Sequence, residues 1–462
     1  MSGADAAPGS ATGRLAPAEG LALAEAVLRL AEAGGATEAE VLVAGSDAAL
    51  TRFANSEIHQ NVAATDVRVN LRFVRGKRVG VASSGRTDPD ALRALAGTAG
   101  RIAALAEETP DWAGLPAHGP AAPVRGAFAA GTADAAPELR AAGVRAVVAA
   151  ADAAGVAAFG SFSSEVETLA VATTAGIRAA ESRTRARLVV VTMGPDDGTG
   201  YAEVAAVDAT TIDAGAVGRE AAEKARRSAR PVELPPGELP VVLEEYAVAD
   251  IVERLGFVGF SGLAVEEERS FFEPGRRVGS PLVTIVDDAR DPAGMPASFD
   301  YEGVPTRRVV LLDAGVCGEV VHDAATAARA GVPSTGHGLP APNPWGPFPL
   351  HAAIAAGATA RADLVAGLRD GLLVTRFHYT NVVHPKLAVV TGMTRDGTFL
   401  VRGGEVVGPV RNLRFTQSYL DALAGVEAVA RERRLLGGDF GSLLVPALRV
   451  GAWRFTGATA AG

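Results

Sequence analysis

The chain has 462 residues, more than one ordinary hydrophobic core organises, so its length predicts two domains. Charged residues make up 21% and hydrophobic residues 48%, as in folded proteins outside membranes, and the net charge of −9 argues against nucleic-acid binding. The single cysteine, Cys317, excludes an intrachain disulfide and fits a reducing compartment. We therefore expect a soluble, cytoplasmic protein without a membrane span.

The first half of the chain begins with a stretch that lacks an apolar targeting segment, and we expect a disordered tail over residues 1–17. Hydrophobic periodicity then predicts a helix over 18–33 and another over 88–107, where Asp88 and Pro89 are typical of a helix start. Alternation of apolar and polar residues predicts antiparallel strands between them, at residues 40–44, 50–54, 66–73 and 78–83.

The same reasoning predicts an alanine-rich helix over 137–154, three or four strands between 156 and 191, and a helix over 212–229. The Pro-rich stretch that follows marks the best domain boundary, a linker at residues 231–237. We therefore expect an N-terminal domain over residues 18–230 and a C-terminal domain over residues 238–462.

Strands dominate the predicted C-terminal domain. A strand over 239–244 is followed by a helix over 246–255, and residues 308–313 form a buried strand that leads to a small helix ending at Gly331. We further expect a meander of three strands and a late amphipathic helix, at residues 389–393, 398–402, 405–410 and 418–434 respectively. The predicted fold class is α+β: an antiparallel sheet with helices, then a larger strand-rich domain.

Motifs for nucleophilic or phosphate chemistry are weak in this sequence. Ser261 lacks the glycine spacing of a nucleophile elbow, and Ser334 lies too near His337 in sequence for the usual serine and histidine geometry. In a strand, His378 and His384 would stand roughly 20 Å apart, so they share a metal only if a loop intervenes. We find no phosphate-binding loop and no dinucleotide fingerprint.

Several motifs in series resemble the TldD/TldE (PmbA) family of metallopeptidase subunits. They are Phe299-Asp-Tyr-Glu-Gly-Val-Pro305, Thr326-Ala-Ala-Arg329, Ser334-Thr-Gly-His337 and Thr51-Arg-Phe-Ala-Asn-Ser-Glu-Ile-His-Gln-Asn61. The catalytic TldD branch carries an HExxxH zinc helix and a cysteine ligand near its C-terminus. Here the corresponding segment, residues 243–256, contains no histidine, Asp250 and Glu253 alone are poor zinc ligands, and residues 437–462 contain no cysteine. The chain therefore resembles the TldE branch.

This resemblance implies a subunit that binds no cofactor itself and pairs with a TldD-like partner subunit that holds zinc. The complex would trim or degrade small unfolded or ribosomally made modified peptides. The chain would complete the chamber and present the peptide by edge-strand hydrogen bonding. The candidate groove or interface residues are Phe260, Ser261, His337, His378, Tyr379 and Asn381. Two alternatives stay open: a stand-alone hydrolase with an unrecognised site, and a modulator of a DNA topoisomerase.

Overall fold

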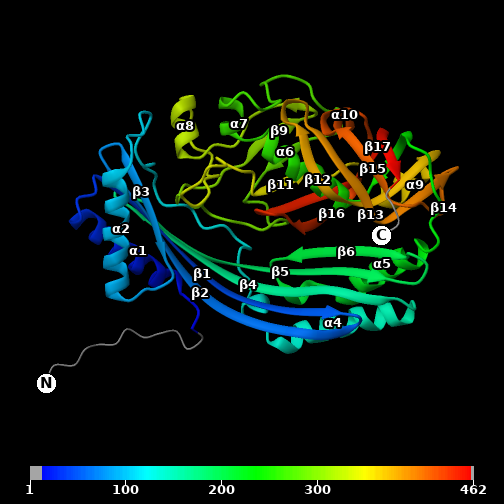
Figure 1. Cartoon of the computed structure of the whole chain (residues 1–462), viewed down its shortest axis with the longest axis horizontal. Coiled ribbons are helices and arrows are strands. Elements are labelled where there is room, and N and C mark those ends of the chain that lie inside the picture. The colour runs from blue at the N-terminus through cyan, green and yellow to red at the C-terminus, as the bar shows by residue number, and fades with distance from the viewer. Residues whose placement is uncertain (1–12, 459–462) are drawn as a thin grey trace.

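The computed structural model describes residues 13–458 and builds them around two sheets. The first sheet has six antiparallel strands in the order β3-β2-β1-β4-β5-β6 (Figure 1). Their bounds are β1 Glu38–Ala54, β2 Glu57–Arg75, β3 Arg78–Ser84, β4 Ala157–Thr173, β5 Arg178–Met193 and β6 Thr199–Ala206. Consecutive strands mostly pair as hairpins, and α2 to α4 separate β3 from β4.

Two groups of helices pack against this sheet. Figure 1 shows α1 and α2 at one end of the long strands and α4 and α5 at the other. Both α1 and α2 begin with proline, and the side chain of Asp88 caps α2 by accepting from the Ala91 N–H. The helices are α1 Pro17–Ala33, α2 Pro89–Leu105, α3 Ala130–Ala133, α4 Pro137–Ala153 and α5 Ala214–Arg227, with a 3₁₀ turn at Ala209–Thr211.

The second domain contains an eleven-stranded sheet, part of which closes into a barrel. β7 pairs in parallel with β12 and antiparallel with β17, so β17, β15, β13, β12 and β7 form a closed ring. The strands are β7 Gly237–Leu243, β8 Ile285–Asp287, β9 Val309–Asp313, β10 Val316–Cys317, β11 His351–Ile354, β12 Asp370–His384, β13 Val389–Arg402, β14 Glu405–Pro409, β15 Leu413–Ser418, β16 Val426–Gly437 and β17 Ser442–Ala458.

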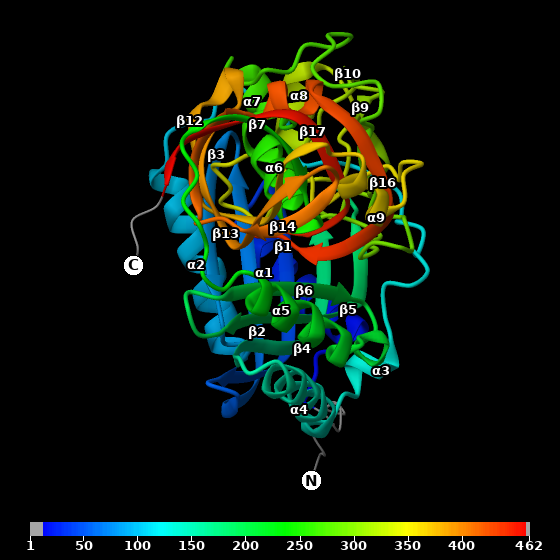
Figure 2. The ribbon, with the colours of Figure 1, turned by 90° about the vertical axis from the view of Figure 1, so that its right-hand side faces the viewer.

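Helix α6 (Glu245–Val258) lies in the middle of this ring (Figure 2) and is buried along most of its length. It follows β7 directly, as the sequence predicts. The barrel core includes Trp453, which is fully buried and stacks on Phe377 at 4.9 Å between ring centroids. Shorter helices lie outside the ring: α7 Gly262–Glu266, α8 Ala324–Ala330, α9 Arg361–Ala366 and α10 Tyr419–Ala424, with a 3₁₀ turn at Pro385–Leu387.

The α+β fold class is confirmed, and two of the predicted strand breaks are wrong. Residues 40–44 and 50–54 belong to one strand, β1, because β2 and β4 pair with it on both sides without interruption at Gly45. The break predicted between the strands at residues 389–393 and 398–402 is an irregularity inside β13, where Asp396 and Gly397 have positive φ while β12 pairs on either side.

The late helix predicted over residues 418–434 is also wrong beyond α10. Gly425 ends the helix, and residues 426–437 form β16, which pairs antiparallel with β17. Strand pairing overrides the helical spacing of the apolar residues there. Val426, Ala428 and Ala430 become buried inside the second domain as part of this strand.

Most of the predicted tail, residues 1–12, lies outside the described residues. Within the part that the structure describes, Arg14 forms an ion pair with Asp47 of β1, and the Leu15 carbonyl accepts from the Thr168 hydroxyl of β4. Among residues 13–458, no helix is long and apolar enough to cross a membrane.

We predict that Trp453→Ala lowers the free energy of unfolding by about 3–5 kcal/mol, because it removes the largest side chain from the closed barrel. Trp345→Ala is the matched control. Trp345 is 63% exposed, so its loss should change stability by less than about 0.5 kcal/mol. Urea unfolding followed by circular dichroism measures both, and equal effects would contradict the central position of Trp453.

Candidate functional site

Helix α6 occupies the place where the resemblance puts the zinc helix, and its carboxylates are bound by the protein itself. Asp250 is half-buried and accepts hydrogen bonds from the Thr380 and Tyr419 hydroxyls, each at 2.6 Å. Glu253 accepts from the Asp439 N–H. Burial raises the pKa of Asp250 and raises that of Glu253 to about 7. Both groups therefore favour the protonated state more than exposed carboxylates do.

These side chains do not fit a zinc ion. Zinc in proteins takes histidine, cysteine or available carboxylate ligands in a tetrahedral set. No histidine lies between residues 243 and 256, and both carboxylates already serve hydroxyl or N–H donors. Across residues 13–458, no three His, Cys, Asp or Glu side chains are grouped so as to hold a metal ion.

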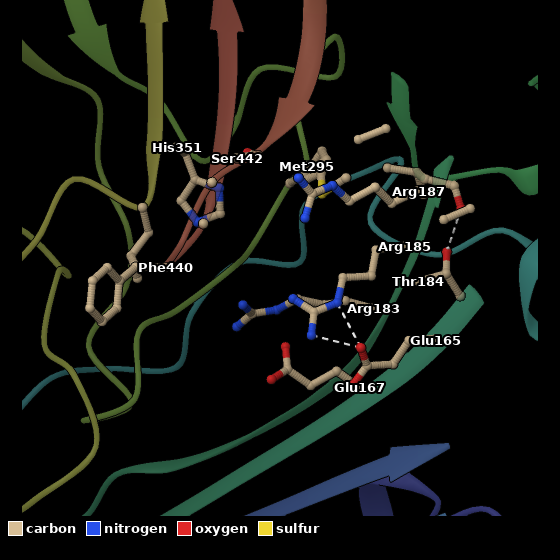
Figure 3. A pocket seen from close by; sticks show the side chains of 18 of the residues that line it. Glu165, Glu167, Arg183, Thr184, Arg185, Arg187, Met295, His351, Phe440 and Ser442 are labelled. Atoms are coloured by element: carbon tan, nitrogen blue, oxygen red, sulfur yellow. Dashed lines mark hydrogen bonds and ion pairs between the residues drawn. The ribbon is translucent and has the colours of Figure 1, made fainter. Parts of the chain in front are cut away.

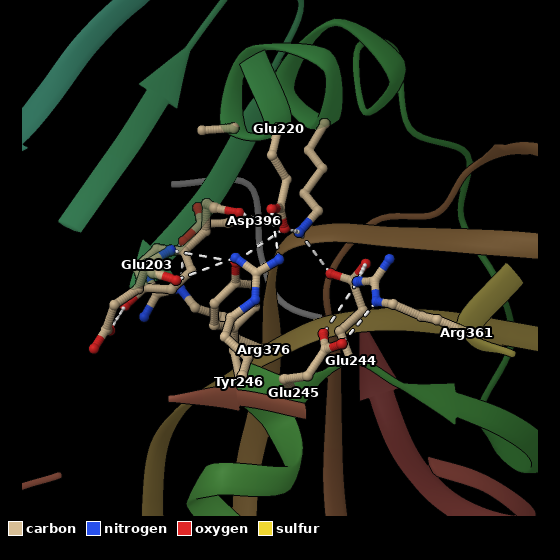
Figure 4. Close-up of polar contacts among 12 residues, drawn as sticks. Glu203, Glu220, Glu244, Glu245, Tyr246, Arg361, Arg376 and Asp396 are labelled. Carbon is tan, nitrogen blue, oxygen red and sulfur yellow. Dashed lines mark hydrogen bonds and ion pairs between the residues drawn. The ribbon is translucent and has the colours of Figure 1, made fainter. Parts of the chain in front are cut away.

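The first turn of α6 joins the barrel to the first domain through a charged network (Figure 4). Glu220 of α5 accepts from Arg434 of β16 and from the Tyr246 hydroxyl of α6, at 2.8 and 2.9 Å. Lys224 Nζ lies 2.8 Å from Glu220 and 2.6 Å from Glu244. Burial alone would raise the pKa of Glu220, but the two cations lower it to about 2.

A second ion pair closes the other side of this network. Arg361 at the start of α9 donates to Glu245 at 2.7 Å and to Glu244 at 2.9 Å. Burial would raise the pKa of Glu244, but Lys224 and Arg361 hold it below its usual range. Glu244 is thus ionised and paired with Lys224 and Arg361, which fixes the start of the helix relative to α5.

A cavity of about 390 Å³ lies between the first sheet and the second domain (Figure 3). Arg183, Arg185 and Arg187 of β5 form one wall together with Glu165 and Glu167 of β4. Because alternate residues of a strand share a face, the three arginines point to the same side of the sheet. His351, Phe440 and Ser442 lie across the cavity, as Figure 3 shows.

Arg185 and Arg187 are only partly satisfied by protein acceptors, whereas Arg183 donates to Glu181 and to the Phe299 carbonyl. Arg185 binds Glu165 through two nitrogens, at 2.8 and 2.6 Å, and Arg187 Nε donates to Glu203 at 2.7 Å. The side chains of Arg185 and Arg187 are 56% and 44% exposed. A guanidinium carries five N–H donors, so each retains donors that face the cavity.

A second cavity, of about 190 Å³, continues from the first toward α6. Both are lined by Arg187, Gly437, Gly438 and Asp439, and the smaller one also reaches Asp250 and Glu253. We call the two together the interdomain cleft. It runs from the arginines of β5 to the helix that stands at the position of the family's zinc helix.

The sequence signature at residues 299–305 is a buried hydrogen-bonded loop that neighbours this cleft. The Asp300 carboxylate accepts from the N–H groups of Glu302, Val304 and Gly338. Arg72 of β2 lies 3.5 Å from Glu302. Burial raises the pKa of Asp300 to about 7 and that of Glu302 to about 8. The loop thus links the first sheet to residues 334–338.

His337 is a buried member of this arrangement. Its Nε2 lies 2.8 Å from Asp287 Oδ1, and its Nδ1 lies 3.0 Å from the Thr335 carbonyl oxygen. Asp287 also accepts from the His351 N–H. Burial would raise the pKa of Asp287, but His337 lowers it. The pair connects β8, β11 and the loop before the cleft.

The six residues that the sequence indicated as groove or interface residues do not lie together in the structure. Phe260, Ser261 and His337 are buried, and Phe260 packs edge-on against Phe271 at 5.6 Å between centroids. The other three lie together on an irregular part of β12, where Tyr379 is 72% exposed and has positive φ: His378, Tyr379 and Asn381. None of the six lines the interdomain cleft.

The sequence analysis did not identify the residues that line the cleft, although one sequence pattern pointed to some of them. Arginine at every second position, residues 183, 185 and 187, predicts a charged face on one strand. Nothing in the sequence indicates that His351 and Phe440 lie opposite that face, because these segments are far apart along the chain.

Three domain models of one protein family match most of this chain. Residues 39–103 match PmbA/TldA metallopeptidase domain 1, residues 130–229 match the central domain, and residues 236–457 match the C-terminal domain.

Among curated relatives, the chain is similar to a metalloprotease TldD homolog of Haemophilus influenzae, at 27% identity over 229 residues, 47% of this chain and 46% of the relative. It is also similar to a metalloprotease of Methanothermobacter thermautotrophicus, at 25% identity over 226 residues, 47% of this chain and 48% of the relative. The chain thus matches about half the length of these relatives.

Among solved structures, the chain is similar to TldE from Thermococcus kodakarensis, with a TM-score of 0.87 and 20% identity over 94% of this chain and 100% of that one. It is also similar to a Thermotoga maritima protein described as a modulator of a DNA gyrase, with a TM-score of 0.82 and 18% identity over 94% of this chain and 99% of that one. At these identities the likeness shows the fold.

The buried carboxyls predict an unusual pH dependence. Asp300 and Glu302 have folded-state pKa values above those of the unfolded chain, so the folded state binds more protons between about pH 4.5 and pH 8. We expect these two groups to lower the free energy of unfolding as pH rises through that window, with His351, whose pKa burial lowers to about 4, opposing them below about pH 6.5. Glu220, with its lowered pKa, acts only below it.

Glu302→Gln should flatten this slope, because glutamine resembles the protonated carboxyl and does not titrate. Urea unfolding at several pH values from 5 to 8.5 measures it. Glu57→Gln, at an exposed position, should leave the slope unchanged. Identical slopes for wild type and Glu302→Gln would contradict the assignment.

We predict that His337→Ala destabilises the fold by about 3–5 kcal/mol, because it leaves the buried Asp287 carboxylate without its partner. His378→Ala, which removes a half-buried ring on β12, should cost much less. Thermal unfolding of the two variants distinguishes them, and a larger effect at His378 would refute the role given to His337.

Proposed function

The chain belongs to the PmbA/TldA metallopeptidase family, and on that premise we propose that it is the TldE-like, non-catalytic subunit of a heteromeric zinc metallopeptidase. The partner would be a TldD-like subunit that holds the zinc. The complex would trim or degrade small unfolded or ribosomally made modified peptides in the cytoplasm.

One observation carries the proposal: the side chains of α6 are engaged as structural groups. Glu245 binds Arg361, Asp250 binds two hydroxyls, and Glu253 binds a backbone N–H of the loop at 437–441. A subunit that supplied the zinc would need this helix to present ligands to the cleft. Here the helix anchors the barrel to the first domain.

The interdomain cleft supports a role in holding peptide. One wall carries glutamates on β4 next to arginines on β5. The opposite wall presents Phe440, Leu350 and His351. Free N–H donors of Arg185 and Arg187 would bind peptide carbonyl or carboxylate oxygens, and Glu167 would bind amides or amines. We propose this cleft as the main peptide site, with the exposed residues Tyr379 and Asn381 as part of a subunit interface.

We also propose residues 231–237 as the linker between the domains. The chain crosses there from α5 to β7, and the Val232 N–H pairs with the Pro409 carbonyl of β14.

The alternative of a stand-alone hydrolase is favoured by one feature of the same cleft. His351 of β11 and Ser442 of β17 are register partners in a parallel pair, and both line the cavity. Burial lowers the pKa of His351 to about 4, which keeps the ring neutral near pH 7 but makes it a weak base. The modulator reading has support only from the descriptions of fold neighbours at 18% identity.

The decisive measurement is zinc content and peptidase activity of the purified chain, alone and mixed with a TldD-like subunit from the same source. We expect substoichiometric zinc and no cleavage alone, and cleavage in the mixture. Stoichiometric zinc with cleavage by the single chain would overturn the proposal.

Variants of this chain then distinguish a role in binding the peptide from a role in the catalytic reaction. In the mixture, Arg185→Gln with Arg187→Gln should raise KM more than it lowers kcat, because these side chains would bind peptide. Arg93→Gln with Arg101→Gln, at two exposed positions of α2, is the charge-matched control. Loss of all activity on Ser442→Ala, at unchanged assembly, would favour the hydrolase alternative.

A further inference from the structure

The outer edge of the first sheet is an unpaired strand. β2 pairs with β1 on its inner side from Glu57 to Val74, whereas β3 covers its outer side only from Val69 onward. The outer backbone groups of residues 57–68 therefore have no strand partner in the described chain. Figure 1 shows β2 extended beyond β3 at this rim.

This part of β2 is also open on both faces. Residues 57–66 are all exposed, although neighbouring residues point to opposite sides of a strand. Ile58 and Val62 are 41% and 42% exposed. A β-bulge at His59, near the Asn55-Ser56 turn, leaves residues 60–68 as a regular edge.

Long exposed edges are normally protected, and the protection of this one is confined to the β-bulge at His59 and the charged residues Asp66 and Arg68. Proteins block such edges with proline, lysine, or a covering loop, since an open edge accepts strands from other chains. Residues 60–68 contain no proline, no lysine and no glycine, and residues 61–65 (Asn-Val-Ala-Ala-Thr) carry no charge. A regular edge of roughly 30 Å is thus available for pairing.

The sequence of this edge fits a second copy of itself. Two identical strands that pair across a two-fold axis are antiparallel, and directly opposed residues point to the same face. One residue must therefore face its own copy. With Ala63 at the axis, Val62 faces Ala64, Asn61 faces Thr65, and Gln60 faces Asp66.

That register is complementary at each position. Small apolar side chains meet at the centre, and amide groups meet a hydroxyl and a carboxylate on either side. No like charges face each other. From this geometry we propose that residues 60–68 of β2 form a two-fold interface with a second copy of this chain, which joins the two first sheets into one. The interface lies at the opposite edge of the sheet from β6 and leaves the interdomain cleft open.

The measurement is the molar mass in solution by light scattering over a dilution series. Wild type should be a dimer. Ala63→Lys places two ammonium groups face to face at the axis and should weaken dimerisation roughly tenfold or more. An equimolar mixture of Ala63→Lys and Ala63→Asp should restore the dimer. Val332→Lys, at an exposed site away from β2, should have no effect.

A covalent test does not depend on affinity. The chain has one cysteine, Cys317, which is buried, so Ala63→Cys adds the only exposed thiol among the described residues. Opposed residues in antiparallel strands have Cα atoms about 4.5–5.5 Å apart, within reach of a disulfide. Mild oxidation should cross-link Ala63→Cys and leave Val332→Cys without a covalent cross-link.

A monomeric wild type, or a dimer that persists unchanged in Ala63→Lys, would overturn the inference. So would an effect of Ala63→Lys confined to association with a TldD-like chain, because the edge would then serve a different subunit. None of these results bears on zinc or peptidase activity, so this inference and the proposed function fail independently.

Discussion

Glu220 on α5 and Arg434 on β16 form an ion pair across the boundary between the two domains, and the position of every cleft residue depends on it. Lys224, Glu244 and Tyr246 complete a set of groups that are largely removed from water. Charges in such a place are costly unless each keeps its partner. Sliding the barrel over the first sheet would break several pairs at once, so the network specifies one relative placement of the domains.

Close backbone contacts at glycines, in addition to the charged network, determine how the cleft walls meet. A Cβ atom on Gly441 would lie 1.9 Å from the Leu350 carbonyl oxygen, and one on Gly437 would lie 2.9 Å from Arg187 Nε. Only glycine at position 441 lets the loop between β16 and β17 come this near to the backbone just before β11, whereas the flexible Arg187 side chain could move aside for a Cβ at position 437. Gly441 thus brings two walls of the cleft together from segments that are distant in sequence.

Because the cleft is built from distant segments, sequence reasoning identified local elements but not the cleft. Helices α1, α2 and α4 have local signals, such as the Asp88 cap and prolines at the first turn, and were predicted within two residues. β16 was predicted as helix because its pairing with β17 decides its conformation. Family motifs led to the signature loop at residues 299–305, yet burial of Phe260 and Ser261 depends on tertiary packing that their neighbours in sequence do not reveal.

The closure of the barrel imposes an order of events during synthesis. β7 begins at Gly237 but gains its second neighbour only from β17, residues 442–458. The first sheet needs nothing beyond residue 206 for its strands. It is free to form while the ribosome is still translating the second half, whereas α6 stays unenclosed until some two hundred residues later. Nascent chains therefore expose the apolar surface of α6 for a long interval, which makes this helix the natural point of contact for a chaperone.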